Sequence, residues 1–105
     1  MTAAMPFPGT RKGSKILVAE AERHIARLIQ VNLERAGYRV VTAPDGKEAL
    51  MKAESEQPDL ILLGALSPPL DADEVLERLR ASEATKHLRV VMVPHERRGG
   101  GSRRS

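Results

Sequence analysis

The fold is indicated most strongly by the stretch Gln57-Pro-Asp-Leu-Ile-Leu-Leu63, in which an uninterrupted run of four apolar residues begins two positions after a proline. A short apolar run that begins just after a helix-breaking residue is typical of a strand buried on both of its faces. Residues 60–63 are therefore predicted to be the central strand of a sheet.

Shorter apolar runs on either side of this stretch predict three more strands, at residues 15–18, 38–42 and 90–93. The segments between the strands have helical spacing. The first helix is predicted to place four apolar residues on one face that packs on the sheet, namely Ile25, Leu28, Ile29 and Leu33.

Signals for helix ends agree with this division. Gly37 follows the first helical segment and is predicted to be its C-terminal cap. Asp45 and Glu48 are three residues apart at the start of the second helix, as in a capping box. Asp71 and Glu74 repeat this spacing at the start of the third. The chain therefore alternates strands and helices, which predicts an α/β fold whose parallel sheet has helices on both faces and right-handed crossovers.

The composition limits the function. The chain has 105 residues, enough for one small domain, and no cysteine, which excludes disulfides and thiolate metal sites. No apolar run approaches the ~18 residues of a membrane span, so a cytoplasmic protein is expected. Residues 14–94 carry 11 Lys/Arg against 13 Asp/Glu, a balance of −2, so the basic charge lies at the two ends.

Those ends also differ in composition from the rest. Residues 1–13 contain two prolines and two glycines without periodicity, and they are predicted to be a flexible arm. Residues 14–95 are predicted to be the folded domain. Residues 96–105 contain Arg and Gly but no apolar residue, and they are predicted to be a disordered basic tail.

Ligands of a doubly wound sheet bind at the carboxyl ends of its strands. Glu20 and Glu22 follow the first strand, and two interpretations of them stay open. They approach a cation, or, as we favour, they are carboxylates stabilised by the dipole at a helix start. No glycine-rich nucleotide-binding loop and no cluster of metal-ligating residues is present, so no cofactor or metal is expected.

Several stretches together resemble the receiver domain of a two-component response regulator. They are Lys15-Ile-Leu-Val-Ala-Glu-Ala-Glu22, Asn32-Leu-Glu-Arg-Ala-Gly-Tyr38, Asp45-Gly46, Glu48-Ala-Leu50, and Gln57 to Leu63 with Pro68 shortly after. The resemblance covers residues 14–95 and implies a flavodoxin-like fold. A complete receiver resembles five strand–helix units, so four strands and three helices are expected here, as in a domain truncated after its fourth strand.

The resemblance also implies which residues occupy the phosphorylation site. The phosphoacceptor aspartate at the end of the third strand corresponds to Gly64, and the acidic pair that holds magnesium corresponds to Glu20 and Ala21. The hydroxyl residue that ends the fourth strand corresponds to Pro94. Together with Glu22, these positions form a degenerate acidic pocket. Phosphoryl transfer, metal binding and enzymatic activity are therefore not expected.

The leading hypothesis is a phosphorylation-independent pseudo-receiver that works by protein–protein contact in phosphorelay signalling. The expected interface is an exposed fourth strand of Val90, Val91, Met92 and Val93, which pairs with a second copy or with a partner protein. One alternative is a nucleic-acid accessory protein that uses its arginine tail, although no aromatic residue lies among the arginines to stack on bases. The other is a non-functional fragment of a receiver gene.

Overall fold

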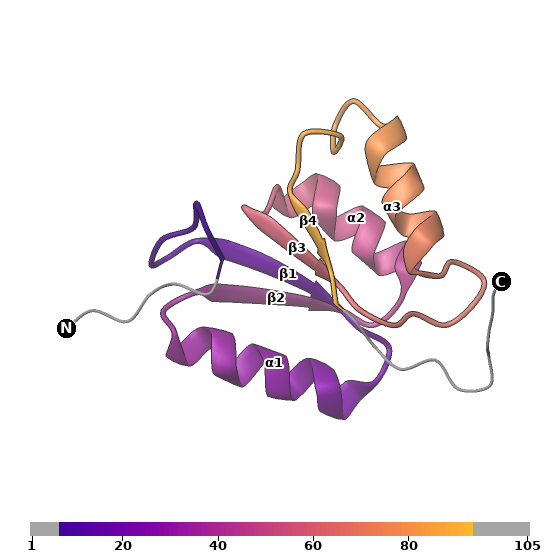
Figure 1. Cartoon of the computed structure of the whole chain (residues 1–105). Helices are drawn as coiled ribbons and strands as arrows, with labels where there is room; N and C mark the ends of the chain where they lie inside the picture. The colour runs from indigo at the N-terminus through magenta and orange to yellow at the C-terminus, as the bar shows by residue number, and fades with distance from the viewer. Residues whose placement is uncertain (1–6, 94–105) are drawn as a thin grey trace, which may run out of the picture.

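The computed structural model describes residues 7–93, which form one parallel sheet between two layers of helices (Figure 1). In chain order the elements are β1 (Lys15–Ala19), α1 (Arg23–Arg35), β2 (Arg39–Ala43), α2 (Gly46–Glu56), β3 (Leu60–Leu63), α3 (Ala72–Ala81) and β4 (Val90–Met92). The strand order is β2-β1-β3-β4 and every pairing is parallel. The flavodoxin-like fold, with four strands and three helices, is therefore confirmed.

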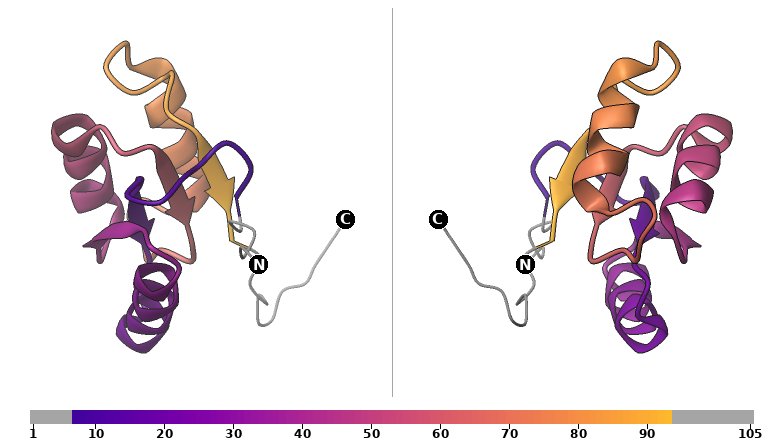
Figure 2. Two further views of the ribbon diagram at one scale, coloured as in Figure 1. Left: turned by 90° about the vertical axis from the view of Figure 1, so that its left-hand side faces the viewer. Right: turned by 90° about the vertical axis from the view of Figure 1, so that its right-hand side faces the viewer.

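The helices cover the two faces of the sheet unequally. Helix α1 lies on one face, and α2 and α3 lie on the other (Figures 1 and 2). The core is divided accordingly into two clusters, one on each face, which share the central strands β1 and β3. All four residues of β3 are buried, as expected for a strand with helices on both sides.

The predicted helix ends are confirmed by their hydrogen bonds. The Asp45 carboxylate accepts from the Glu48 backbone N–H at 2.8 Å, and Asp71 accepts from Glu74 at 2.9 Å. Gly37 has φ of +102° just after α1, a left-handed conformation that glycine adopts without strain. These signals depend only on neighbours in sequence, so they could be predicted without the fold.

The apolar face predicted for α1 is only partly correct. Leu33 is buried and Ile29 is half-buried, but Ile25 is 45% exposed and Leu28 is 62% exposed. At ~100° per residue, Leu28 projects roughly 140° away from Leu33 around the helix axis. One helix face cannot bury both, and packing on β1 and β2 selects the side of Leu33.

The described part of the N-terminal arm packs against the domain. The Phe7 ring lies 6.3 Å from the ring of Tyr38, measured between centroids, and the Thr10 hydroxyl is 2.6 Å from the Tyr38 hydroxyl. Tyr38 is only 3% exposed, so the arm contacts a core residue of the α1 face. The rest of the predicted arm and the predicted basic tail lie outside the described residues.

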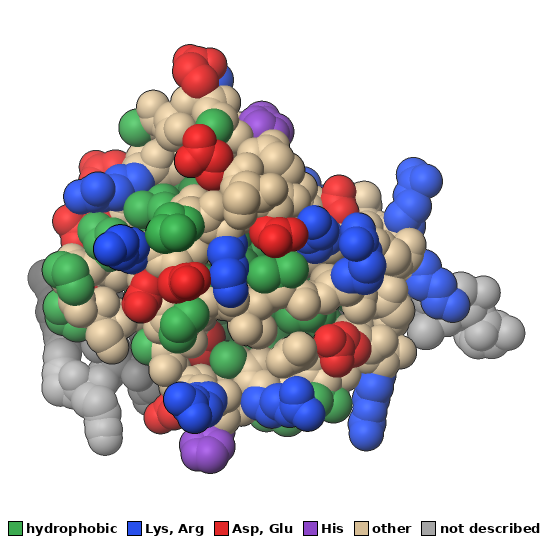
Figure 3. Space-filling view, turned by 180° about the vertical axis from the view of Figure 1, so that it is seen from behind, with side chains coloured by type: hydrophobic (Ala, Val, Ile, Leu, Met, Phe, Trp, Pro, Cys, Tyr) green, Lys and Arg blue, Asp and Glu red, His purple; other side chains and the backbone are tan. Residues whose placement is uncertain are grey.

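The surface carries acidic and basic side chains interspersed over the face shown in Figure 3, with hydrophobic side chains between them. This mixture agrees with the small net charge of residues 14–94. Within residues 7–93, none of the helices is long and apolar enough to cross a membrane.

Candidate functional site

The predicted site residues meet where β1 and β3 end. The Gly64 N–H donates to the Ala19 carbonyl at 2.8 Å, and the Ala21 N–H donates to the Ala65 carbonyl at 3.0 Å. These bonds extend the β1–β3 pairing past the last residues of both strands. The loop before α1 and the loop after β3 therefore lie side by side, as the parallel topology requires.

Glu20 connects the two loops through its carboxylate, although it is only 5% exposed. Its Oε2 accepts from the Glu22 N–H at 3.0 Å, and its Oε1 accepts from the Ala65 N–H at 3.3 Å. Glu22 is the N-cap residue of α1, but its exposed side chain makes no capping bond. The buried carboxylate of Glu20 thus accepts one hydrogen bond from the N-cap residue of α1 and one from the loop after β3, and neither glutamate side chain makes a capping bond to α1.

Gly64 lies directly against this carboxylate. A Cβ atom at Gly64 would overlap Oε1 of Glu20 and would lie 3.3 Å from the Ala19 carbonyl oxygen. The backbone of Gly64 is not in a left-handed conformation, so a side chain here would meet no backbone strain but would have to displace the Glu20 carboxylate. The Glu20 side chain therefore occupies the volume that any side chain at position 64 would enter.

The residues present at this edge do not fit a magnesium ion. Mg²⁺ takes near-octahedral oxygen ligands, usually including one or two carboxylates. Residues 7–93 contain no group of three or more His, Cys, Asp or Glu side chains placed to hold a metal. Both oxygens of Glu20 already accept backbone hydrogen bonds, and Ala21 has no ligand atom.

A pocket of about 270 Å³ opens beside Glu20, between the start of α1 and the end of β2. Arg23 and Thr42 line it together with Glu20. It contains polar groups, yet Gly64 supplies no side chain for covalent chemistry. The arrangement holds two loops together; it contains no nucleophile paired with a base.

The remaining predicted site residues lie along β4. The Arg89 carbonyl accepts from the Ile61 N–H at 2.8 Å, and the Val93 N–H donates to the Leu63 carbonyl at 2.9 Å. Because backbone groups alternate along a strand, those of Val90 and Met92 point away from β3. Among the described residues, no strand pairs with that outer side of β4. Pro94 lies outside the described residues.

The contact between Glu20 and Gly64 was not predicted from the sequence. There the glycine corresponds to the family's aspartate, and the glutamate was expected to act at the start of a helix. The signal available in the sequence was a glycine directly after one apolar strand and a glutamate directly after another. This pattern predicts a contact only when β1 and β3 are known to be neighbouring strands.

Comparison with known proteins gives a consistent result. The family model of the response regulator receiver domain matches residues 16–98. The alkaline phosphatase synthesis transcriptional regulatory protein PhoP of Bacillus subtilis is 58% identical over 66 residues, which are 63% of this chain and 28% of that protein. The DNA-binding dual master transcriptional regulator RpaA of Synechocystis is 39% identical over 79 residues, 75% of this chain and 33% of that protein.

Solved structures agree. The N-terminal domain of a response regulator receiver protein from Methanoculleus marisnigri superposes with a TM-score of 0.73 at 38% identity, covering 75% of this chain and 64% of that one. TrrA of Thermotoga maritima, solved with Mg²⁺ and BeF, gives 0.69 at 32% identity, covering 75% and 67%. The matched part of the chain corresponds to about a third or less of the length of PhoP and of RpaA.

Proposed function

Because the chain belongs to the response regulator receiver domain family, we propose that it serves two-component signalling as a receiver that works without phosphoryl transfer, by contact with other proteins. The observation that carries this proposal is the position of the Glu20 carboxylate, which fills the space that a side chain at Gly64 would need. Glycine has no nucleophile, so a phosphoryl group has no acceptor at this position.

The second support is that both carboxylate oxygens of Glu20 already accept hydrogen bonds from the protein backbone. A carboxylate that accepts two backbone N–H bonds is stabilised in place, and moving it to coordinate a cation would leave both donors without partners. Glu20 joins the loop before α1 to the loop after β3. On this proposal the two loops stay in one arrangement, and the output does not depend on a phosphorylation cycle.

Contact with a partner requires an exposed surface, and the domain has two candidates. The first is the outer side of β4, where the backbone groups of Val90 and Met92 point away from the sheet and Met92 is 39% exposed. An edge of this kind pairs readily with another strand. The second is the exposed pair Ile25 and Leu28 on α1, since adjacent exposed apolar side chains often mark an interface.

The test of lost phosphoryl chemistry uses beryllofluoride, which mimics a phosphoryl group on aspartate. The ¹⁵N-labelled chain is titrated with beryllofluoride and magnesium while its amide spectrum is recorded. We expect the amides of Gly64 and Ala65 to stay unchanged. TrrA is the positive control, because its structure was solved with Mg²⁺ and BeF. Saturable shifts at Gly64 in the unaltered chain would show that the proposal is wrong.

A restored variant makes a negative result informative. Glu20→Asp, Ala21→Asp and Gly64→Asp together place aspartates at the three positions that the family resemblance assigns to the site; two of these positions have no carboxylate in the unaltered chain. The shorter Asp at position 20 also vacates the space beside position 64. Beryllofluoride shifts in this triple variant, but not in the parent chain, are the expected result. They would locate the loss of the switch in these three residues.

A further inference from the structure

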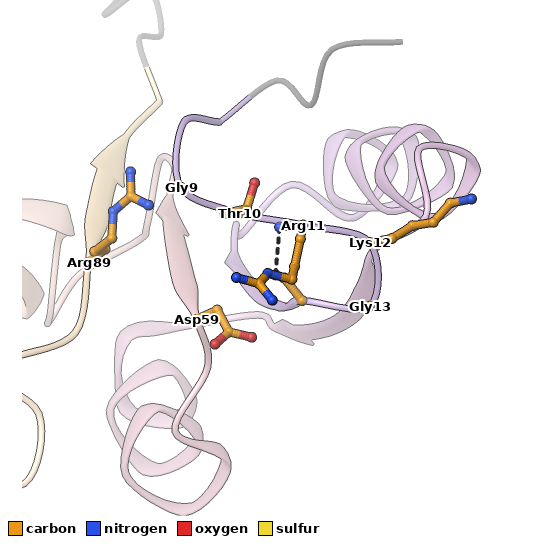
Figure 4. Close-up of a pocket in the computed structure, with 8 residues that line it drawn as sticks. Gly9, Thr10, Arg11, Lys12, Gly13, Asp59 and Arg89 are labelled. Atoms are coloured by element: carbon orange, nitrogen blue, oxygen red, sulfur yellow. Dashed lines mark hydrogen bonds between the residues drawn. The ribbon is translucent and has the colours of Figure 1, made fainter. Parts of the chain in front are cut away.

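A second pocket lies at the end of the sheet where the strands begin, opposite the end where Glu20 lies. Its volume is about 470 Å³. Three segments line it: the arm loop of residues 9–14, Asp59 just before β3 and Arg89 just before β4 (Figure 4). The site described above uses none of these residues, and neither does the proposed function.

The wall formed by the arm loop is held in shape by backbone geometry. Gly9 and Gly13 have φ of +86° and +87°, conformations that favour glycine. At the end of the loop the Ser14 N–H donates to the Arg11 carbonyl at 2.9 Å, and the Gly13 N–H donates to the Gly37 carbonyl at 2.8 Å. The loop is therefore held against the domain by backbone hydrogen bonds, and its conformation is formed without a ligand.

The pocket contains hydrogen-bond donors that the protein leaves unused. The Arg11 guanidinium makes no hydrogen bond or ion pair within residues 7–93, and Arg89 uses only Nη1, which donates to the Pro8 carbonyl at 2.7 Å. Ser14 is only 9% exposed; its hydroxyl accepts from the Arg11 N–H at 3.1 Å, and its own hydrogen has no acceptor among the described residues. Figure 4 shows Arg11 and Arg89 on two sides of the pocket.

The charge of the lining favours an anion. Arg11, Lys12 and Arg89 are cationic and Asp59 is the one carboxylate among the lining residues, which leaves a balance of +2. Asp59 is partly engaged, because its Oδ2 accepts from the Lys15 N–H at 2.8 Å. Lys12 points away from the centre in Figure 4, so the two guanidinium groups are the groups placed to contact a ligand.

We propose that this pocket binds a small phosphate-bearing anion through its phosphate group. Guanidinium groups donate two parallel hydrogen bonds to phosphate oxygens, and two of them on opposite walls contact one ligand from both sides. The Ser14 hydroxyl supplies a neutral donor beside them. The open pocket leaves room for the rest of a larger molecule to extend into solvent.

The test is a titration of the full-length ¹⁵N-labelled chain with pyrophosphate at constant ionic strength. We expect saturable amide shifts confined to residues 9–14 and to Asp59 and Arg89. Arg11→Ala is expected to weaken binding about tenfold, because it removes one charge-assisted contact. The Arg11 side chain makes no hydrogen bond or ion pair within residues 7–93, so the variant is expected to keep its fold.

Two further variants make the experiment specific. Arg27→Ala removes an exposed arginine of α1 that does not line the pocket, and it should leave the affinity unchanged. Asp59→Asn keeps an acceptor for the Lys15 N–H but removes a repulsive charge, and it should tighten binding. Shifts spread over the basic surface, or equal losses from Arg11→Ala and Arg27→Ala, would overturn the proposal. A short oligonucleotide that displaces pyrophosphate from the pocket at lower concentration would also overturn it, and would assign the pocket to a nucleic-acid backbone.

Discussion

The contact between Glu20 and Gly64 makes a quantitative prediction for the substitution Gly64→Ala. The added methyl group would overlap Oε1 of Glu20, so the carboxylate must move away from the Ala65 N–H. Forcing one carbon into a filled site costs about 1–3 kcal/mol of unfolding free energy. We expect Gly64→Ala to destabilise the chain by that amount.

The reasoning is tested by repeating the substitution without the obstructing side chain. In a Glu20→Ala background the space is vacant, and the backbone of Gly64 is compatible with alanine. There Gly64→Ala is expected to be neutral or to stabilise by up to about 1 kcal/mol, because alanine restricts the unfolded chain. The double-mutant cycle should therefore give a coupling energy of about 1–3 kcal/mol.

The assay is urea unfolding followed by far-UV circular dichroism, since the chain has one tyrosine and no tryptophan to serve as a fluorescent probe. Glu22→Ala combined with Gly64→Ala is the matched control, because the Glu22 side chain is exposed and makes no capping bond. That pair should be additive. Additivity of the Glu20 and Gly64 pair within ~0.5 kcal/mol would refute the claim that Glu20 fills the position-64 volume.

Three further predictions concern other parts of the domain. On α1, Leu28→Ala should change the unfolding free energy by less than ~0.5 kcal/mol, because Leu28 is exposed, whereas Leu33→Ala should cost about 2–5 kcal/mol. If the two variants lowered the urea midpoint equally, the observed orientation of the helix would be contradicted. Lys15 lies 2.8 Å from the Glu56 carboxylate, and its hydrogen bond and charge lower the pKa of Glu56. The unaltered chain should therefore be more stable than Glu56→Gln above the ordinary glutamate pKa, and this difference should disappear as the pH falls through the lowered pKa of Glu56. A difference that stays constant over a pH series of unfolding curves would contradict this. At the outer side of β4, Met92→Lys should convert any self-associated chain toward the monomer, and an unchanged mass by light scattering would place the contact elsewhere.

Local signals in the sequence were sufficient for the secondary structure. The capping pair of Asp45 and Glu48 and the terminal Gly37 act on backbone groups within four residues, and the structure confirms both. The apolar run of residues 60–63 likewise predicted a strand buried on both faces, since helices must cover a parallel sheet. The order of these elements indicated the fold class.

Tertiary structure decided the features that depend on partners distant in sequence. Periodicity grouped Leu28 with Leu33 on α1, but the sheet buries only the side of Leu33. Glu20 and Gly64 became neighbours because β1 pairs with β3, an adjacency that no local pattern contains. The sequence by itself determined the helices, the strands and the absence of a nucleophile at position 64. What fills that position was decided by packing, because the volume available to a side chain depends on atoms that only the folded chain brings together.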